Sequence, residues 1–255
     1  MIVFRLCFIL LFLNTSYASS VLFGFKTKDA AYLSATSSVE NGGGVVMQDN
    51  FELINSIGDT MIAGIIGDNS DVDYLRRQLE AANVEHKLTF HGESLRCEAM
   101  ANYCGGIIAK HLRGPTPLNV ECMLAGCGVN GEPVLYWLDS IGSIQKVEYG
   151  AFGKDSALVL STLDRCNREN KFADMIGYQE IPSESRTVID TLIGSPSQED
   201  DRYNTGYKKQ SNFPRNVVEN CWSVLRTRST TFAPAGSCQV KAMIASRGVL
   251  SLDHV

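Results

Sequence analysis

The fold is decided by the stretch from Leu118 to Gly153, LNVECMLAGCGVNGEPVLYWLDSIGSIQKVEYGAFG. Three segments rich in apolar residues, LNVECMLAGCG, VLYWLDS and IQKVEYGAFG, are separated by VNGEP and IGS. Short apolar runs bounded by glycine, asparagine, serine and proline are typical of strands joined by tight turns. The stretch therefore predicts three consecutive β-strands.

Further strands are predicted on its N-terminal side. The residues from Ser20 to Ala35 form two partly alternating runs around KTKD, which predicts a hairpin. The glycines of ENGGG (40–44) predict a flexible turn. VVMQDNFELINSI (45–57) and TMIAGIIGD (60–68) predict two more strands, and the second is apolar enough to be buried.

Four segments are predicted to be helical, at 69–86, 94–114, 155–166 and 212–229. Asn69 or Ser70 is the expected N-cap of the first helix. In the second helix, one set of side chains recurs every four residues and predicts an apolar stripe, flanked by Cys104, Ile108 and Leu112: Leu95, Ala99, Tyr103, Ile107 and His111. Residues 238–252 predict a closing hairpin.

The order of these elements is strands, two helices, strands, two helices, strands. Runs of strands followed by runs of helices favour the α+β class over alternating α/β folds. Two antiparallel sheets stacked face to face, each covered by a helix pair, would bury both faces of the apolar strands. We therefore expect one domain at 20–255, preceded by a leader at 1–19 and interrupted by a polar surface insertion at about 166–211.

Composition and charge exclude several functions. The chain has 255 residues, a formal net charge of −5 and a pI of about 5.4, which argues against a nucleic-acid-binding surface. Its eight cysteines form no C-x-x-C pair and no zinc-ligand spacing, so we expect small buried apolar side chains, with no metal or cofactor.

The leader MIVFRLCFILLFLNTSYAS resembles a signal peptide, and its apolar core is shorter than the ~20 residues of a membrane span. Two observations oppose secretion. No N-x-Ser/Thr sequon follows residue 20, and seven cysteines, an odd number, remain without the leader. A propeptide, a wrongly assigned start and a targeting segment remain open.

The nucleophile-elbow, zinc-protease and Walker patterns are absent from the sequence. Packing or surface roles are expected for the four histidines, His86, His91, His111 and His254. A plain turn is expected for the glycines at 42–44. Helix-cap or turn roles are expected for the carboxylates that could form a catalytic pair: Asp49, Glu52, Asp68, Asp71 and Asp73.

Four segments together resemble the β subunits of the 20S proteasome: VLFGFKTKDAAYLSA, IIGDNSDVDYLRRQL, NVECMLAGCGVNGEPVLYWLDSIGSIQKV and LSTLDR. The resemblance covers 20–166 and about 213–252, and within the family it is strongest to the non-catalytic subunit at the fourth position of the β ring. It implies a four-layer αββα sandwich of the N-terminal-nucleophile hydrolase type.

The resemblance also implies where a catalytic site would lie. Active members use an N-terminal Thr, freed by cleavage after Gly, together with an Asp and a Lys. Counting from Gly24 without gaps places Ser20 at the nucleophile, Ser19 at the Gly, Thr36 at the Asp and Glu52 at the Lys. Because Glu52 reverses the sign of the required charge and Thr36 is not a carboxylate, we expect no catalysis.

The expected role is therefore structural, in ubiquitin-dependent protein degradation. The expected partners are other β subunits in a heteroheptameric ring, α-ring subunits and the opposite β ring, in the cytoplasm and nucleus, without nucleic acid or membrane. Two alternatives remain open: an active peptidase that uses Ser20, and a secreted binding protein with a true signal peptide.

Overall fold

The computed structural model describes residues 20–36, 39–40, 46–48, 52–169, 212–228, 238–244 and 248–251. The predicted leader, the GGG turn, Asp49, His254 and most of the predicted insertion lie outside the described residues. In the described part of the chain, no helix is long and apolar enough to cross a membrane.

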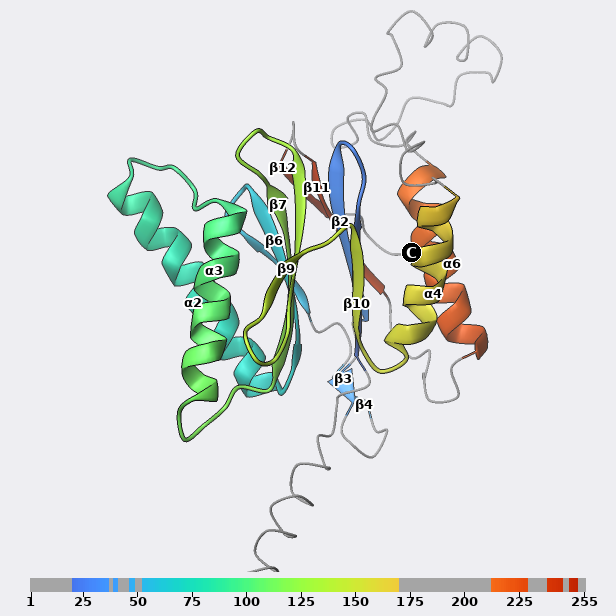
Figure 1. The fold of residues 1–255 in the computed structure, drawn as a ribbon, viewed down its shortest axis with the longest axis horizontal. Coiled ribbons are helices and arrows are strands. Elements are labelled where there is room, and N and C mark those ends of the chain that lie inside the picture. The colour runs from blue at the N-terminus through green and yellow to red at the C-terminus, as the bar shows by residue number, and fades with distance from the viewer. Residues whose placement is uncertain are drawn as a thin grey trace, which may run out of the picture.

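Two five-stranded antiparallel sheets form the centre of the molecule (Figure 1). Sheet I has the order β10-β1-β2-β11-β12, with β1 (Val21–Lys26), β2 (Ala30–Thr36), β10 (Tyr149–Gly153), β11 (Cys238–Ile244) and β12 (Gly248–Ser251). Sheet II has the order β5-β6-β7-β8-β9, with β5 (Ile54–Ile57), β6 (Met61–Gly67), β7 (Val120–Cys127), β8 (Pro133–Leu138) and β9 (Ile144–Lys146). A separate short ribbon pairs β3 (Val39–Glu40) with β4 (Val46–Gln48).

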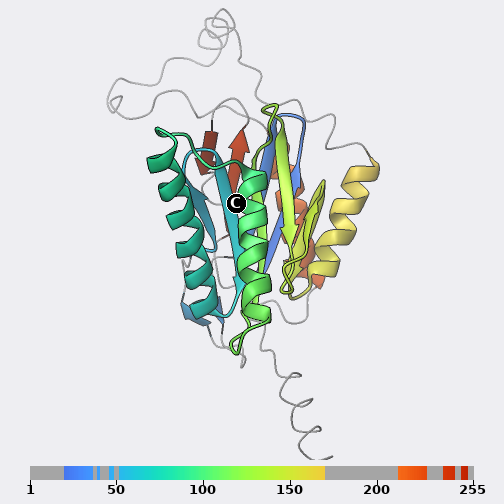
Figure 2. The ribbon, with the colours of Figure 1, turned by 60° about the vertical axis from the view of Figure 1, so that its left-hand side comes forward.

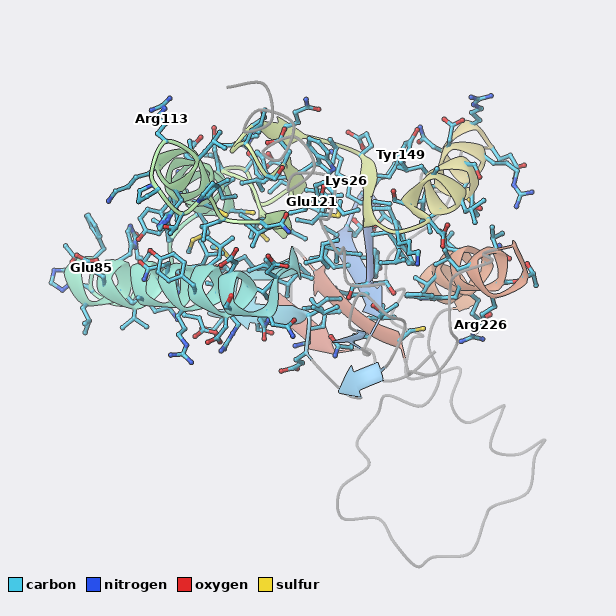
Figure 3. The ribbon with its side chains drawn as sticks, turned by 90° about the horizontal axis from the view of Figure 1, so that it is seen from below. Lys26, Glu85, Arg113, Glu121, Tyr149 and Arg226 are labelled. Atoms are coloured by element: carbon cyan, nitrogen blue, oxygen red, sulfur yellow. The ribbon has the colours of Figure 1, made fainter. Side chains whose placement is uncertain are left out.

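A helix pair covers the outer face of each sheet (Figures 1 and 2). Helices α2 (Asn69–Thr89) and α3 (Cys97–Leu112) pack on sheet II, whereas α4 (Ser156–Arg168) and α6 (Asn212–Arg228) pack on sheet I. Seen from below, the two helix pairs flank the sheets on opposite sides (Figure 3). The predicted α+β class and the four-layer αββα arrangement are confirmed.

Three apolar clusters fill the three spaces between these four layers. Leu22, Leu33 and Met123 belong to the cluster between the sheets. Phe23 and Trp222 belong to the cluster between sheet I and its helices, with ring centroids 5.4 Å apart. Successive residues of a strand point to opposite faces, so Leu22 and Phe23 serve different clusters.

The predicted N-cap of the first helix is wrong by one or two residues. Asp68 is the N-cap, with an extended backbone, and α2 already includes Asn69 and Ser70. The amide of Asp68 donates to the carbonyl of Asn119 at 3.1 Å. This contact continues the strand conformation through Asp68, so the helix begins immediately after it.

The predicted apolar stripe of α3 is correct for Cys104 and Ile108, which are buried, and is shifted for the rest of the helix. Tyr103 is 41% exposed, and the buried face consists of Cys97, Met100, Ala101, Cys104, Gly105 and Ile108. Gly105 belongs to this face because its missing side chain leaves room for Ile144 of β9. The third predicted helix continues as α4 to Arg168, two residues beyond its expected end.

The described cysteines are packing residues. All seven are free thiols, and only Cys127 among them is not fully buried. Burial raises the pKa of Cys97 and of Cys221 to about 12, so both remain protonated at neutral pH. Among the described residues, no group of three or more His, Cys, Asp and Glu side chains is arranged to hold a metal ion.

Candidate functional site

The three residues that the sequence places at the hydrolase positions come from three segments. Ser20 immediately precedes β1, Thr36 is the last residue of β2, and Glu52 lies two residues before β5. Strands β1 and β2 are neighbours in sheet I, whereas β5 is an edge strand of sheet II. The site therefore depends on how the two sheets meet.

Ser20 is enclosed by the end of sheet I and is 3% exposed. Val21 pairs with Gly153 of β10, and a side chain at Gly153 would overlap the carbonyl oxygen of Ser20. Gly153 also has a φ of +90°, in the region that favours glycine. This close approach fixes the Ser20 backbone against β10 and leaves its side chain without open access to solvent.

Thr36 uses its hydroxyl to support the backbone of β1. The amide of Val21 donates to Oγ1 of Thr36 at 3.3 Å, in a buried setting. Thr36 pairs with Cys238 of β11 and is 5% exposed. A neutral hydroxyl that accepts this bond fills the position where the resemblance implies a carboxylate, so the position carries no negative charge.

Glu52 is paired with a lysine from the C-terminal part of the chain. Nζ of Lys241 lies 3.0 Å from Oε1 of Glu52, with side chains 12% and 64% exposed, respectively. Lys241 pairs with Leu33, three residues along β2 from Thr36. At ~3.4 Å per residue, the ion pair is attached to sheet I roughly 10 Å along the strand from the Thr36 end.

Gln239 holds the backbone next to Glu52. Its side-chain oxygen Oε1 accepts hydrogen bonds from the amides of Leu53 at 3.1 Å and Ile54 at 3.3 Å. Leu53 also accepts a bond at its carbonyl from the amide of Ile65, at 3.1 Å. Leu53 is thus tied to sheet II through its carbonyl and to sheet I through its amide.

The backbone of Gln239 takes part in a second buried contact. Oγ of Ser34 donates to the carbonyl of Gln239, and Nε1 of Trp222 donates to Oγ of Ser34, both at 3.0 Å. These bonds join α6, β2 and β11. They support the strand from which Gln239 and Lys241 project, and Trp222 itself is 1% exposed.

Three features of this arrangement bear on nucleophilic catalysis. In the full chain the nitrogen of Ser20 is a peptide amide, which cannot serve as the base that an N-terminal amine provides. The ammonium of Lys241 is neutralised by Glu52 and is displaced along the strand from Thr36. The hydroxyl of Ser20 is buried.

The other carboxylates considered from the sequence have structural roles at α2. Asp68 occupies the N-cap position without a side-chain capping bond, and Oδ2 of Asp71 accepts the amide of Asn119 at 2.9 Å. Asp73 binds Arg76 at 2.6 Å and Arg77 at 2.7 Å. The hydrogen bond from Arg76, helped by both positive charges, lowers the pKa of Asp73.

The described histidines lie at the ends of α2 and α3. His86 stacks on Phe90 with ring centroids 4.4 Å apart, and its Nδ1 lies 3.0 Å from the carbonyl of Glu93. Nε2 of His111 lies 3.1 Å from the hydroxyl of Tyr74. His91 occupies a turn with a φ of +53°. These contacts join neighbouring elements, as expected for packing and surface roles.

Sequence reasoning missed Lys241 and Gln239. Neither residue belongs to a local motif, and Lys241 is 189 positions from Glu52. One signal was available, because the alternation in CQVKAMI places Gln239 and Lys241 on the same strand face as Met243, which packs between the sheets. Polar side chains directed towards an inter-sheet space require partners.

Two antiparallel sheets enclosed by two helix pairs, the first strand beginning directly after Ser20, define the class of N-terminal-nucleophile-type αββα sandwiches. The proteasome subunit family model matches residues 17–174, and the chain belongs to this family, as a β-type subunit.

Named relatives agree with this assignment. The chain is 29% identical to the probable proteasome subunit beta type-4 of Neurospora crassa over 146 residues, covering 57% of this chain and 71% of the relative. It is 32% identical to the probable proteasome subunit beta type-4 of Schizosaccharomyces pombe over 138 residues, covering 52% and 69%. It is 38% identical to the proteasome subunit beta type-2-B of Arabidopsis thaliana over 80 residues, covering 31% and 40%.

Proposed function

We propose that this chain is a non-catalytic β subunit of the 20S proteasome core, which completes the β ring and the wall of the proteolytic chamber. The observation that carries the proposal is the carboxylate of Glu52 at the position of the required ammonium, held by Lys241 at 3.0 Å. Residue 52 therefore supplies no ammonium that could stabilise the deprotonated form of an attacking hydroxyl.

Two further features support the absence of catalysis. Thr36 supplies a neutral hydroxyl that is already engaged by the amide of Val21. Ser19 stands where the resemblance implies the glycine of the self-cleavage site, so release of a Ser20 amine is not expected. Without that amine, Ser20 lacks the base that N-terminal nucleophiles use.

The proposed role is geometric. Other β subunits in a heteroheptameric ring, α-ring subunits and the opposite β ring are the proposed partners, in ubiquitin-dependent degradation in the cytoplasm and nucleus. Head-to-tail ring contacts must close, so each position in the ring needs a folded subunit of defined shape even where it has no active site. The two helix layers, packed on the outer faces of the sheets, contribute to such a shape without using the Ser20 site.

The domain organisation follows from this proposal. We propose a single domain from residue 20, preceded by a leader and carrying a surface insertion after α4. The family match that begins at residue 17 supports the position of the first boundary. We propose no cofactor for this role.

The proposal is tested on the tagged full-length chain purified from its own cells. Native mass spectrometry should find it in a particle of many hundred kilodaltons, and an electrophile specific for N-terminal hydroxyl nucleophiles should modify other β subunits but not Ser20. Recovery as a 27.9 kDa monomer would contradict the ring assignment. An adduct on Ser20 would contradict the absence of catalysis.

A further inference from the structure

Two side chains of β11 reach across to the same short segment of sheet II. Gln239 accepts the amides of Leu53 and Ile54, and Lys241 binds the carboxylate of Glu52. Consecutive residues 52–54 are therefore held at three points by two residues of the opposite sheet. No comparable position is implied by the resemblance to active hydrolases.

We propose that Gln239 and Lys241 are positioning residues that fix the backbone carrying residue 52, so that its side chain is directed to β11 and not to Ser20. We call these two residues and 52–54 the inter-sheet latch. The inference deepens the proposed function and rests on it, because it explains how the reversed charge at residue 52 is held in place.

The side chain of Gln239 accepts hydrogen bonds from two backbone amides at the start of β5. β5 is the edge strand of sheet II, and an edge strand presents unpaired amides. Leu53 and Ile54 are 3% and 0% exposed, so their amides cannot be satisfied by bulk water. The Oε1 atom of Gln239 therefore supplies the acceptor for two buried donors where the chain enters β5.

The ion pair with Lys241 orients the side chain of Glu52 towards β11. Lys241 is 12% exposed, and its stem lies along the inter-sheet side of β11, while Glu52 remains 64% exposed. The lysine side chain is thus the more buried partner of the ion pair, and the glutamate side chain is the more exposed one. Because Lys241 pairs with Leu33 and Thr36 pairs with Cys238, this attraction acts away from the Thr36 and Ser20 end.

The inter-sheet latch predicts that Glu52 and Lys241 can be crosslinked to each other. A carbodiimide should add to the exposed carboxylate of Glu52 to form an O-acylisourea, and the amine of Lys241 should attack its acyl carbon, forming an amide bond and releasing the urea that carries the elements of water. Lys26 and Glu148 form a matched control, with a separation of 2.9 Å and side chains 18% and 65% exposed. Both crosslinks should form in the wild-type particle.

The test combines this crosslink with amide hydrogen exchange on the assembled particle. In Gln239→Leu, the amides of Leu53 and Ile54 should exchange roughly tenfold faster, as expected for the loss of one buried hydrogen-bond acceptor. The 52–241 crosslink should fall several-fold relative to the Lys26–Glu148 crosslink. The amide of Val147, which donates to the carbonyl of Leu135 at the opposite side of sheet II from β5, is the internal control and should be unchanged.

A conservative variant separates positioning from general packing. Gln239→Glu keeps an oxygen acceptor at the same place and should restore the slow exchange of both amides. Unchanged exchange at Leu53 and Ile54 in Gln239→Leu, or a 52–241 crosslink that does not respond, would overturn the inference. Neither outcome depends on whether Ser20 reacts with an electrophile, so failure of the latch is distinguishable from failure of the proposed function.

Discussion

Nζ of Lys241 lies 3.0 Å from Oε1 of Glu52, joining a strand of sheet I to the segment that leads into sheet II. The two residues are 189 positions apart in the chain. The contact places opposite charges together at the one position where the resemblance to active hydrolases implies a lone ammonium. Its strength, its surroundings and its separation from Ser20 can each be tested.

Replacing Lys241 by Met should lower the free energy of unfolding modestly, because one partner of the pair is largely exposed. We expect about 0.5 kcal/mol at low salt, decreasing at high salt as the charges are screened. Denaturant unfolding of the purified chain at two salt concentrations measures this. Lys87→Met is the control, since Lys87 lies 3.3 Å from a 91% exposed Asp59 and should have a smaller effect.

Replacing Ser34 by Ala should destabilise the chain by about 1–3 kcal/mol, because it removes the buried hydroxyl that accepts from Nε1 of Trp222 and donates to the carbonyl of Gln239. The change removes only one atom, so loss of packing contributes little. Ser223→Ala, at an exposed position of α6, is the matched control. Equal unfolding midpoints for the two variants would show that the Trp222 contact does not stabilise the fold.

Gly153→Ala should be strongly destabilising. The new Cβ would overlap the carbonyl oxygen of Ser20, and the φ of +90° is unfavourable for a residue with a side chain. Gly106→Ala is the contrasting change, because Gly106 lies within α3 with open space around its Cβ position, and it should stabilise the helix by up to ~1 kcal/mol. Thermal unfolding should therefore shift in opposite directions in the two variants.

Glu121→Gln should stabilise the chain at neutral pH. Burial, with a smaller contribution from the charge of Asp139, raises the pKa of Glu121. The folded state therefore favours the protonated acid, and this contribution is complete below the ordinary pKa and is lost as pH rises through the raised pKa.

The stabilising effect of Glu121→Gln should thus be present at pH 7 and disappear below about pH 4. Thermal unfolding across this range measures it. Glu121 lies near the middle of the molecule in Figure 3, whereas Glu85 projects from the outer end of α2. Glu85→Gln is the matched control for the loss of one negative charge, and an equal pH-dependent gain in that control would contradict the assigned cause.

Local sequence chemistry was sufficient to predict most of the fold. The turns VNGEP and IGS separate β7, β8 and β9 as expected, and the helix order follows the apolar spacing. The single strand predicted at 144–153 is wrong, because the chain passes from β9 in sheet II to β10 in sheet I within this run. The N-cap of α2 was misplaced because the contact of Asp68 with Asn119 is a tertiary interaction. The phase of α3 was misplaced because small residues such as Ala101 and Gly105 form its buried face, and such residues give a weak apolar signal.

The candidate site was predictable only in part. Counting from Gly24 along one hairpin located Ser20 and Thr36, whose backbones are neighbours through Val21. The partners of Glu52 and Leu53 come from β11, and strand pairing between such distant segments leaves no local pattern in the sequence. Only the assembled sheets reveal that the charge at residue 52 is balanced from across the molecule.

The most direct test of the central claim is a density map of the assembled core particle at a resolution that shows side chains. The account predicts the ammonium of Lys241 within hydrogen-bonding distance of the Glu52 carboxylate, and no lysine ammonium beside Oγ of Ser20. A lysine in contact with a free amino-terminal Ser20, with Glu52 turned elsewhere, would contradict it.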